Sequence, residues 1–372
     1  MIWNMYSQNM NANNQKRNKK KKRNFIFRGV SILCTIVFLV SGLCGCTAGG
    51  NGEKNLSKDQ KKLRVVTTIF PQYDFVRQIA GDNVSLTMLL KPGEETHSYE
   101  PTPQDIIAIQ NADLFIYVGG ENDEWVEDIL ESPEMEDVKR LRLVDCVGNI
   151  LAEEHVEGMK EERGHSHEDE EEESHDEEEH FLHSAEETEE EHNEHVHTMD
   201  EHVWTSPGNA IDIVEHITEE LCSLDSEHGQ TYKDNAEAYE TQLKELDTAF
   251  RDVVENAKNH TLLFGDRFPF RYFAAEYGLE YYAAFSGCAS DTEPSAATMA
   301  FLINKVKEEH IPVVLKMELS NDNIANAIAE ACDVPVKVFY SSHNISAKQF
   351  EAGVTYLDLM KENVETLKEA LR

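Results

Sequence analysis

The sequence has few basic residues for its length and lacks several catalytic motifs. It has 34 Lys and Arg residues against 71 Asp and Glu residues, which gives a formal net charge of −37 over 372 residues. This excess of negative charge excludes a nucleic-acid binder, because the phosphate backbone would repel it. The motifs H-E-x-x-H and G-x-S-x-G are absent, which argues against a metal-dependent or serine hydrolase. We therefore expect a protein that is not an enzyme and that attracts cations.

Cysteine is scarce, and its spacing excludes two kinds of site. None of the seven cysteines forms a C-x-x-C pair, so a zinc-thiolate knuckle and a thioredoxin-type motif are not expected. Four cysteines lie beyond residue 46, namely Cys146, Cys222, Cys288 and Cys332. A disulfide is permitted outside the cytoplasm, but the sequence leaves the pairing open.

The chain also lacks an apolar run long enough for a comfortable membrane span. Residues 16–28 are basic and residues 29–43 are mostly apolar, which is typical of a signal peptide. The run ends in Leu43-Cys44-Gly45-Cys46, which resembles the bacterial lipoprotein box. The resemblance implies cleavage after residue 45 and a diacylglycerol on the sulfur of Cys46, followed by a polar tether over residues 46–62. An uncleaved N-terminal anchor is the alternative, and a start at Met5 or Met10 stays open.

Beyond the tether, strand and helix patterns alternate in two regions. Alternation of this kind predicts a parallel sheet in each region, and therefore an α/β fold of two βα lobes. The N-terminal lobe is expected over 63–205 and the C-terminal lobe over 259–372. The first lobe has strand patterns at 63–69, 84–90, 112–118 and 141–144. The second has them at 260–264, 279–285, 311–316 and 334–340, with helices at 268–277, 298–307 and 323–331 and a closing helix at 347–371.

Residues 206–258 are predicted to form the helices that link the two lobes. Ser206 is a good N-cap, and Pro207 suits the first helical position. A second helix shows apolar residues at alternating spacings of four and three: Tyr232, Ala236, Tyr239, Leu243, Leu246, Phe250 and Val253. A continuous seam of this kind predicts one long rigid helix and hence small lobe motions.

Single histidines stand where an α/β fold places its ligands. His97 follows the turn at 91–93, beyond the strand at 84–90, and His343 follows the last strand pattern. Ligands of parallel sheets bind beyond the carboxyl ends of the strands. His202 lies four residues before the Ser206 cap. Imidazole nitrogens at such places suit a transition metal.

A low-complexity stretch rich in histidine and acid separates His97 from His202. Over about 153–199 the hydrophobic periodicity is lost, which predicts a disordered loop. Neutral imidazoles favour zinc, copper or nickel, so we interpret this stretch as an accessory, weak metal collector, with a solvated acidic spacer as the alternative. Its histidines are His155, His165, His167, His175, His180, His183, His192, His195 and His197.

Five short segments together resemble the zinc or manganese substrate-binding lipoproteins of bacterial ABC importers. They are 65–68 (Val-Val-Thr-Thr), 97–102 (His-Ser-Tyr-Glu-Pro-Thr), 200–207 (Asp-Glu-His-Val-Trp-Thr-Ser-Pro), 272–278 (Tyr-Phe-Ala-Ala-Glu-Tyr-Gly) and 293–295 (Glu-Pro-Ser). The likeness runs from about residue 63 to the end. It implies two βα lobes, a rigid linking helix and one metal ion in the cleft.

The resemblance also implies a ligand set. His97 and His202 match the first two ligands, and His343 falls at the fourth position. The third position, usually His or Glu, falls on Arg267, which cannot bind a cation. Asp266 beside it is the substitute, with a helix cap or an ion pair to Arg267 as its structural alternative, and Glu318 is the reserve.

The implied function is capture of Zn²⁺ outside the cytoplasm by a lipid-anchored protein, expected to be monomeric, and delivery to an ABC permease in the membrane. Manganese is the alternative cargo, although three histidines favour zinc over this harder ion. A surface adhesin or zinc buffer without a permease, and a metal-dependent hydrolase, are the other hypotheses.

Overall fold

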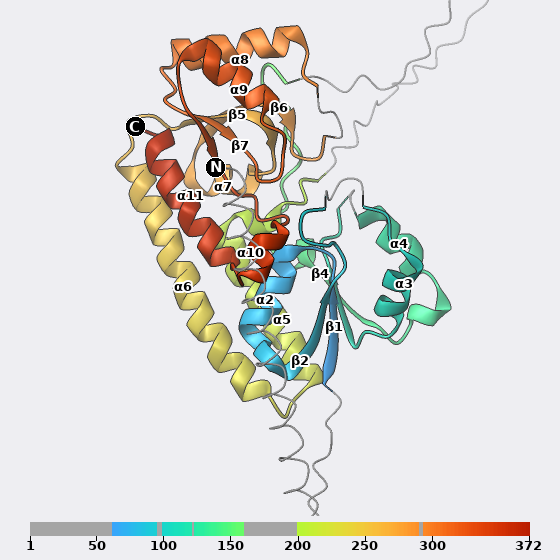
Figure 1. Cartoon of the computed structure of the whole chain (residues 1–372). Helices are drawn as coiled ribbons and strands as arrows, with labels where there is room; N and C mark the ends of the chain where they lie inside the picture. The colour runs from blue at the N-terminus through green and yellow to red at the C-terminus, as the bar shows by residue number, and fades with distance from the viewer. Residues whose placement is uncertain (1–61, 95–98, 121–122, 160–198, 290–292) are drawn as a thin grey trace, which may run out of the picture. The chain divides into compact units, whose positions relative to one another are not determined.

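The computed structural model describes residues 62–94, 99–120, 123–159, 199–289 and 293–372. The predicted α/β class is confirmed, since the described residues form two four-stranded sheets in which all neighbouring strands are parallel. The first sheet has the order β2-β1-β3-β4 and the second the order β6-β5-β7-β8. The two lobes therefore repeat one topology (Figure 1). The strands are β1 (Leu63–Thr67), β2 (Val84–Met88), β3 (Leu114–Tyr117), β4 (Lys139–Arg142), β5 (Thr261–Phe268), β6 (Glu280–Ser286), β7 (Val314–Lys316) and β8 (Val336–Val338).

Helices cover both faces of the first sheet. Neighbouring residues of a strand point to opposite faces, so Val65 packs on one side and Val66 on the other. The side of Val65 is covered by α2 (Phe70–Ala80) and α5 (Pro207–Leu224), and the side of Val66 by α3 (Pro103–Gln110) and α4 (Glu124–Leu130) (Figure 1). Burial on both faces explains why these strands read as apolar runs rather than as alternating patterns.

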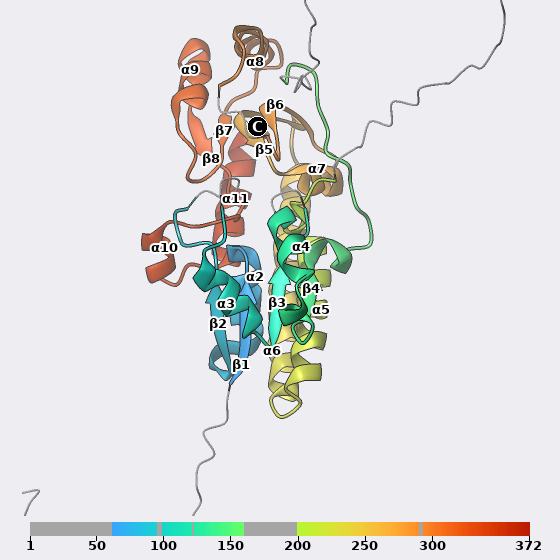
Figure 2. The same ribbon diagram turned by 90° about the vertical axis from the view of Figure 1, so that its right-hand side faces the viewer.

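The second sheet is sandwiched in the same way. Leu263 packs with α8 (Ala296–Glu308) and α9 (Asn323–Cys332), which lie together on one side in Figure 2. Phe264 packs on the other side of the sheet, where α7 (Arg271–Tyr277) lies. Its ring belongs to an aromatic cluster with Phe268, Phe270, Phe339 and Phe273 of α7.

The long linking helix α6 (Gly229–Glu255) contacts both lobes. Near its start the Asn235 side chain donates to the carbonyl of Ile79 in α2 at 2.8 Å. Near its end the Phe250 ring packs on Phe273 of α7 with centroids 4.9 Å apart. The predicted seam is confirmed except at its end, where Val254 is buried and Val253 is only partly buried. One helix thus packs against both lobes, and the small lobe motions expected from it stay a prediction.

Two predicted boundaries in the second lobe are wrong. Strand β5 continues to Phe268, past the expected end at 264, and α7 begins only at Arg271. The closing helix is broken into α10 (Ala347–Glu351) and α11 (Tyr356–Ala370). The break has two local causes, the left-handed backbone of Gly353 (φ 73°) and a capping box formed by Thr355 and Asp358.

The first residues of the acidic stretch are not disordered as predicted. The Glu153 carboxylate accepts a hydrogen bond from the Cys288 amide at 2.9 Å, and Glu154 accepts one from the Tyr281 hydroxyl at 3.0 Å. Met159 is buried in the main core. Residues 160–198 lie outside the described residues, so the prediction of a disordered loop stands only for that part.

The four described cysteines form no disulfide with one another, and Cys146 is buried. No helix in the described part of the chain combines the length and the apolar character needed to cross a bilayer.

Candidate metal site

His202 is held by the residue two positions before it. The ring is completely buried, and its Nδ1 lies 3.1 Å from Oδ1 of Asp200. A carboxylate only accepts hydrogen bonds, so the proton of a neutral His202 ring sits on Nδ1 and Nε2 carries the lone pair. Nε2 is buried and has no hydrogen-bond partner among the described residues. A carboxylate that orients an imidazole in this way commonly accompanies a histidine that binds a metal ion.

The charges around His202 favour a cation. Burial lowers the pKa of His202, but the carboxylates of Asp200 and Glu201 raise it by more, so its pKa lies above the ordinary value. The position of the ring is set by a short helical turn over Val203–Thr205, in which the Thr205 hydroxyl donates to the His202 carbonyl at 2.8 Å. The field that favours a protonated ring also favours a bound metal ion.

His343 reaches the same place from the other lobe. It lies in the segment after β8, and its ring centroid is 5.2 Å from that of His202. The indole of Trp204 lies against both imidazoles, with centroids 5.5 Å from His202 and 4.9 Å from His343. Ser342 before it takes a left-handed backbone (φ 59°), which costs a non-glycine residue about 1–3 kcal/mol and is common at functional sites.

The described residues contain one group of side chains spaced to hold a metal ion. Glu201, His202 and His343 offer ligand atoms that all lie within 4.8 Å of one another. The sequence analysis did not name Glu201 as a candidate ligand, although it stands directly before His202 in a quoted motif.

The carboxylate of Asp266, the predicted substitute ligand, accepts hydrogen bonds from other residues of the second lobe. It lies within β5 rather than in a loop, and its Oδ2 accepts hydrogen bonds from the amide of Met317 at 2.9 Å and from the hydroxyl of Ser320. Its Oδ1 accepts from the amide of Arg267 at 2.9 Å. This backbone contact stands where the alternative structural role of Asp266 was a helix cap or an ion pair to Arg267. Asp266 thus ties β5 to the segment after β7, and it is not in the metal-spaced group.

Glu318, the reserve ligand, contacts the segment that carries His343. Its carboxylate accepts hydrogen bonds from the amide and the hydroxyl of Ser341, at 2.7 and 2.8 Å. Burial raises the pKa of Glu318 to about 7. Because Ser341 stands two residues before His343, this acid fixes the segment that carries the imidazole.

The remaining predicted residues fall mostly outside the described parts. His97 and Cys46 are not described, nor are the histidines of the acidic stretch except His155, which is exposed. The turn before His97 is described. The side chain of Asn344 donates to the carbonyls of Lys91 and Glu94, both at 2.8 Å. These contacts hold the described turn, up to Glu94, beside the residue that follows His343.

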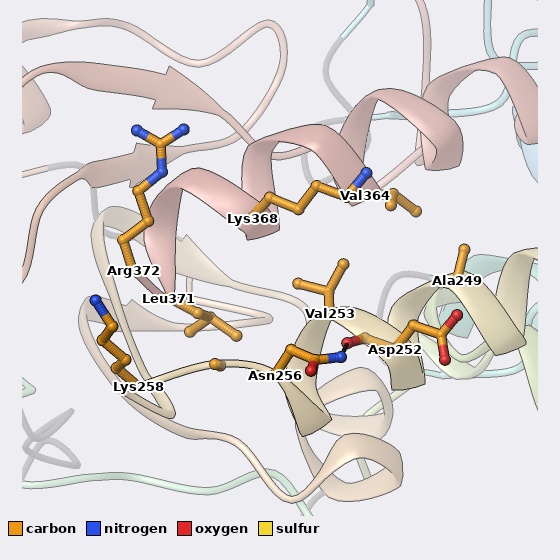
Figure 3. Close-up of a pocket in the computed structure, with 10 residues that line it drawn as sticks. Ala249, Asp252, Val253, Asn256, Lys258, Val364, Lys368, Leu371 and Arg372 are labelled. Atoms are coloured by element: carbon orange, nitrogen blue, oxygen red, sulfur yellow. Dashed lines mark hydrogen bonds between the residues drawn. The ribbon is translucent and has the colours of Figure 1, made fainter.

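A separate hollow of about 550 Å³ lies between the ends of α6 and α11 (Figure 3). Figure 3 shows Val253, Val364 and Leu371 at its wall, with Lys258 and Arg372 around it. None of its ten lining residues is a histidine or a cysteine. This hollow therefore has no part in the candidate metal site.

The role of Asp200 gives a first prediction. Replacing Asp200 by alanine removes the acceptor of His202 Nδ1 and leaves the ring free to rotate. We expect zinc affinity to fall about 10- to 100-fold, the usual cost of losing an outer-shell partner. Chelator competition measures this affinity. The control is Asp225→Ala, which removes the corresponding acceptor of the surface residue His228 and should leave zinc affinity unchanged.

Comparison with known proteins places the chain among metal-uptake components. The family model described as "Zinc-uptake complex component A periplasmic" matches residues 65–370. The zinc-binding lipoprotein AdcA of Streptococcus pneumoniae is 31% identical over 316 residues, which are 85% of this chain and 57% of AdcA. The chain thus spans a little over half the length of that relative.

Two further matches cover nearly the whole length of the chain compared. The high-affinity zinc uptake system protein ZnuA of Bacillus subtilis is 31% identical over 343 residues, which are 90% of this chain and 94% of that protein. The crystal structure of the Zn(II)-bound ZnuA-like domain of S. pneumoniae AdcA is 28% identical and superposes with a TM-score of 0.63, covering 83% of this chain and 99% of that domain. The described site and these matches lead to one conclusion: the chain belongs to the ZnuA family of zinc-uptake components.

Proposed function

We propose that the protein captures Zn²⁺ outside the cytoplasm and delivers it to an ABC permease in the membrane. The observation that carries this proposal is the buried His202 ring, whose Nε2 has no hydrogen-bond partner among the described residues and whose centroid lies 5.2 Å from that of His343. Leaving a buried polar atom without a partner is costly, and a metal ion is the partner that suits this donor set. The zinc-binding names of the relatives support the same cargo.

The ligands proposed from the sequence are His97, His202 and His343. The first lies outside the described residues, three positions after Glu94, whose carbonyl accepts a hydrogen bond from Asn344. The other two belong to the metal-spaced group. Asp266 is a poor fourth ligand, because both of its oxygens accept hydrogen bonds within the second lobe. Buried imidazoles from separate segments suit tight binding of a cargo ion. A catalytic zinc would instead keep an open position for water.

The remaining parts of the proposal concern residues outside the described ranges. Cys46 carries the lipid that tethers the protein to the extracytoplasmic face of the membrane. The histidines of residues 160–198 collect zinc weakly and raise its concentration near the site, and carboxylates between them add attraction for cations. The protein works as a monomer beside its permease.

A growth experiment tests the proposed function. A strain of the source bacterium without this protein should grow poorly when zinc is chelated, and added zinc should restore growth whereas added manganese should not. The wild-type chain should rescue the strain, and a chain with His343→Ala should not. Rescue by manganese alone would instead assign the protein to manganese uptake, and normal growth of the deletion strain would reject the transport proposal.

A further inference from the structure

The metal-spaced group contains an acid that the sequence comparison did not assign as a ligand. His202 and His343 together supply two nitrogens, and the carboxylate of Glu201 lies with them, all three ligand atoms within 4.8 Å of one another. Ligand atoms of a tetrahedral zinc site with bonds of about 2.0–2.2 Å are about 3.4 Å apart. Small side-chain movements therefore suffice to bring the three atoms onto one ion.

The position of Glu201 is built into the fold. The residue is 1% exposed, and the Val203 amide donates to its carbonyl at 2.8 Å in the turn that also orients His202. Its Oε2 would lie only 2.0 Å from a Cβ at position 120, so Gly120 leaves the space that this carboxylate uses. Gly120 follows β3 of the first lobe, whereas His343 follows β8 of the second.

The geometry points to Glu201 as a zinc ligand that supplies the oxygen of the site, in place of Asp266. This inference rests on the proposed zinc capture and deepens it. With neutral imidazoles, Glu201 gives the ion a negatively charged partner in a buried place, where charge attraction is much stronger than in water. Glu201, His202 and His343 then offer zinc one oxygen and two nitrogens, which are donor types that zinc binds in proteins.

The other nearby acids lie outside the metal-spaced group. Glu318 accepts two hydrogen bonds from Ser341. Asp123 accepts hydrogen bonds from the amides of Val118 and Gly119, at 2.6 and 3.1 Å.

The test compares the zinc affinities of variants in which one acidic residue is replaced. The mature chain and its variants Glu201→Gln, Glu201→Asp and Asp266→Asn are titrated with zinc in competition with a chelator. Cobalt(II) is bound in parallel, because its visible spectrum reports changes in the coordination shell. Thermal unfolding without metal checks that each variant folds. Glu201→Asp keeps a carboxylate on a side chain that is one methylene shorter. It tests whether a carboxylate at this position restores zinc affinity.

We expect Glu201→Gln to lower zinc affinity by about 100-fold or more, above the usual range for outer-shell residues. The cobalt spectrum should change with it, Glu201→Asp should recover part of the affinity, and Asp266→Asn should stay near wild type. Wild-type affinity and spectrum in Glu201→Gln would overturn the inference, as would an equal loss in Asp266→Asn. Failure of the wild-type chain to bind zinc would instead overturn the proposed function itself.

Discussion

Replacing His202 by alanine is expected to lower zinc affinity by more than about 100-fold, because changes to outer-shell residues alone cost roughly 10- to 100-fold. The variant loses the buried Nε2 and leaves Asp200 without its imidazole partner. Deletion of residues 160–198 should change the affinity at the main site little, since that stretch is proposed only to collect the ion. Isothermal titration calorimetry or chelator competition measures both effects.

The matched control for His202→Ala is His216→Ala. His216 lies on the exposed side of α5, and its Nδ1 contacts only the carbonyl of Asp212 four residues earlier. Its removal should leave zinc affinity unchanged. If deletion of residues 160–198 abolished binding while His202→Ala did not, the main site would have to lie in the acidic stretch.

Replacing Trp204 by alanine is expected to damage both stability and zinc binding. Trp204 is completely buried, its indole nitrogen donates to the carbonyl of Ser341 at 2.9 Å, and its ring packs on His202 and His343. Removing a buried Trp side chain lowers the free energy of unfolding by about 3–5 kcal/mol. Without the ring, neither imidazole keeps its position, so zinc affinity should fall as well.

A second core variant separates these two effects. Leu302 is completely buried between α8 and the second sheet, in a cluster that contains none of the site residues. Leu302→Ala should lower the free energy of unfolding by about 2–5 kcal/mol and leave zinc affinity near wild type. Urea unfolding and chelator competition, applied to both variants, measure the two quantities. Equal zinc affinities in the two variants would contradict the role given to Trp204.

Much of the fold follows from local patterns. The strand of residues 63–69 and the helix after Ser206 were predictable because burial on both faces produces an apolar run and because Ser-Pro is a strong helix start. The α6 seam was predictable because its apolar residues recur for about six turns. Such signals depend on neighbours in the sequence, so they can be read without knowing the tertiary contacts.

The errors have tertiary or short-range causes. Strand β5 runs past Gly265 because a register shift between Phe264 and Arg267 lets the strand continue beside β6. A glycine at 265 fits because a Cβ there would lie 2.5 Å from the backbone of Ala325. The break at Gly353 was missed because the Thr355 cap looks like an ordinary helical position within a long amphipathic pattern.

The site was only partly predictable, because contacts between distant segments decide which side chains reach it. His202 and His343 were identified from their places in the sequence, and the structure brings their rings together. Asp266 was chosen because it stands next to Arg267, but its oxygens accept hydrogen bonds from Met317 and Ser320 through contacts between distant segments. Glu201 points to the site because Gly120 makes room for it, which no local pattern in the sequence indicates.

The central claim is that imidazoles from distant parts of the chain bind one zinc ion. Zinc-edge X-ray absorption on the purified mature protein, loaded with one equivalent of zinc, tests it most directly. The account predicts about four nitrogen and oxygen neighbours at about 2.0–2.2 Å, with the outer-shell scattering of at least two imidazoles that His202→Ala reduces. A sulfur neighbour at about 2.3 Å, or a shell of oxygens without imidazole scattering, would contradict the account.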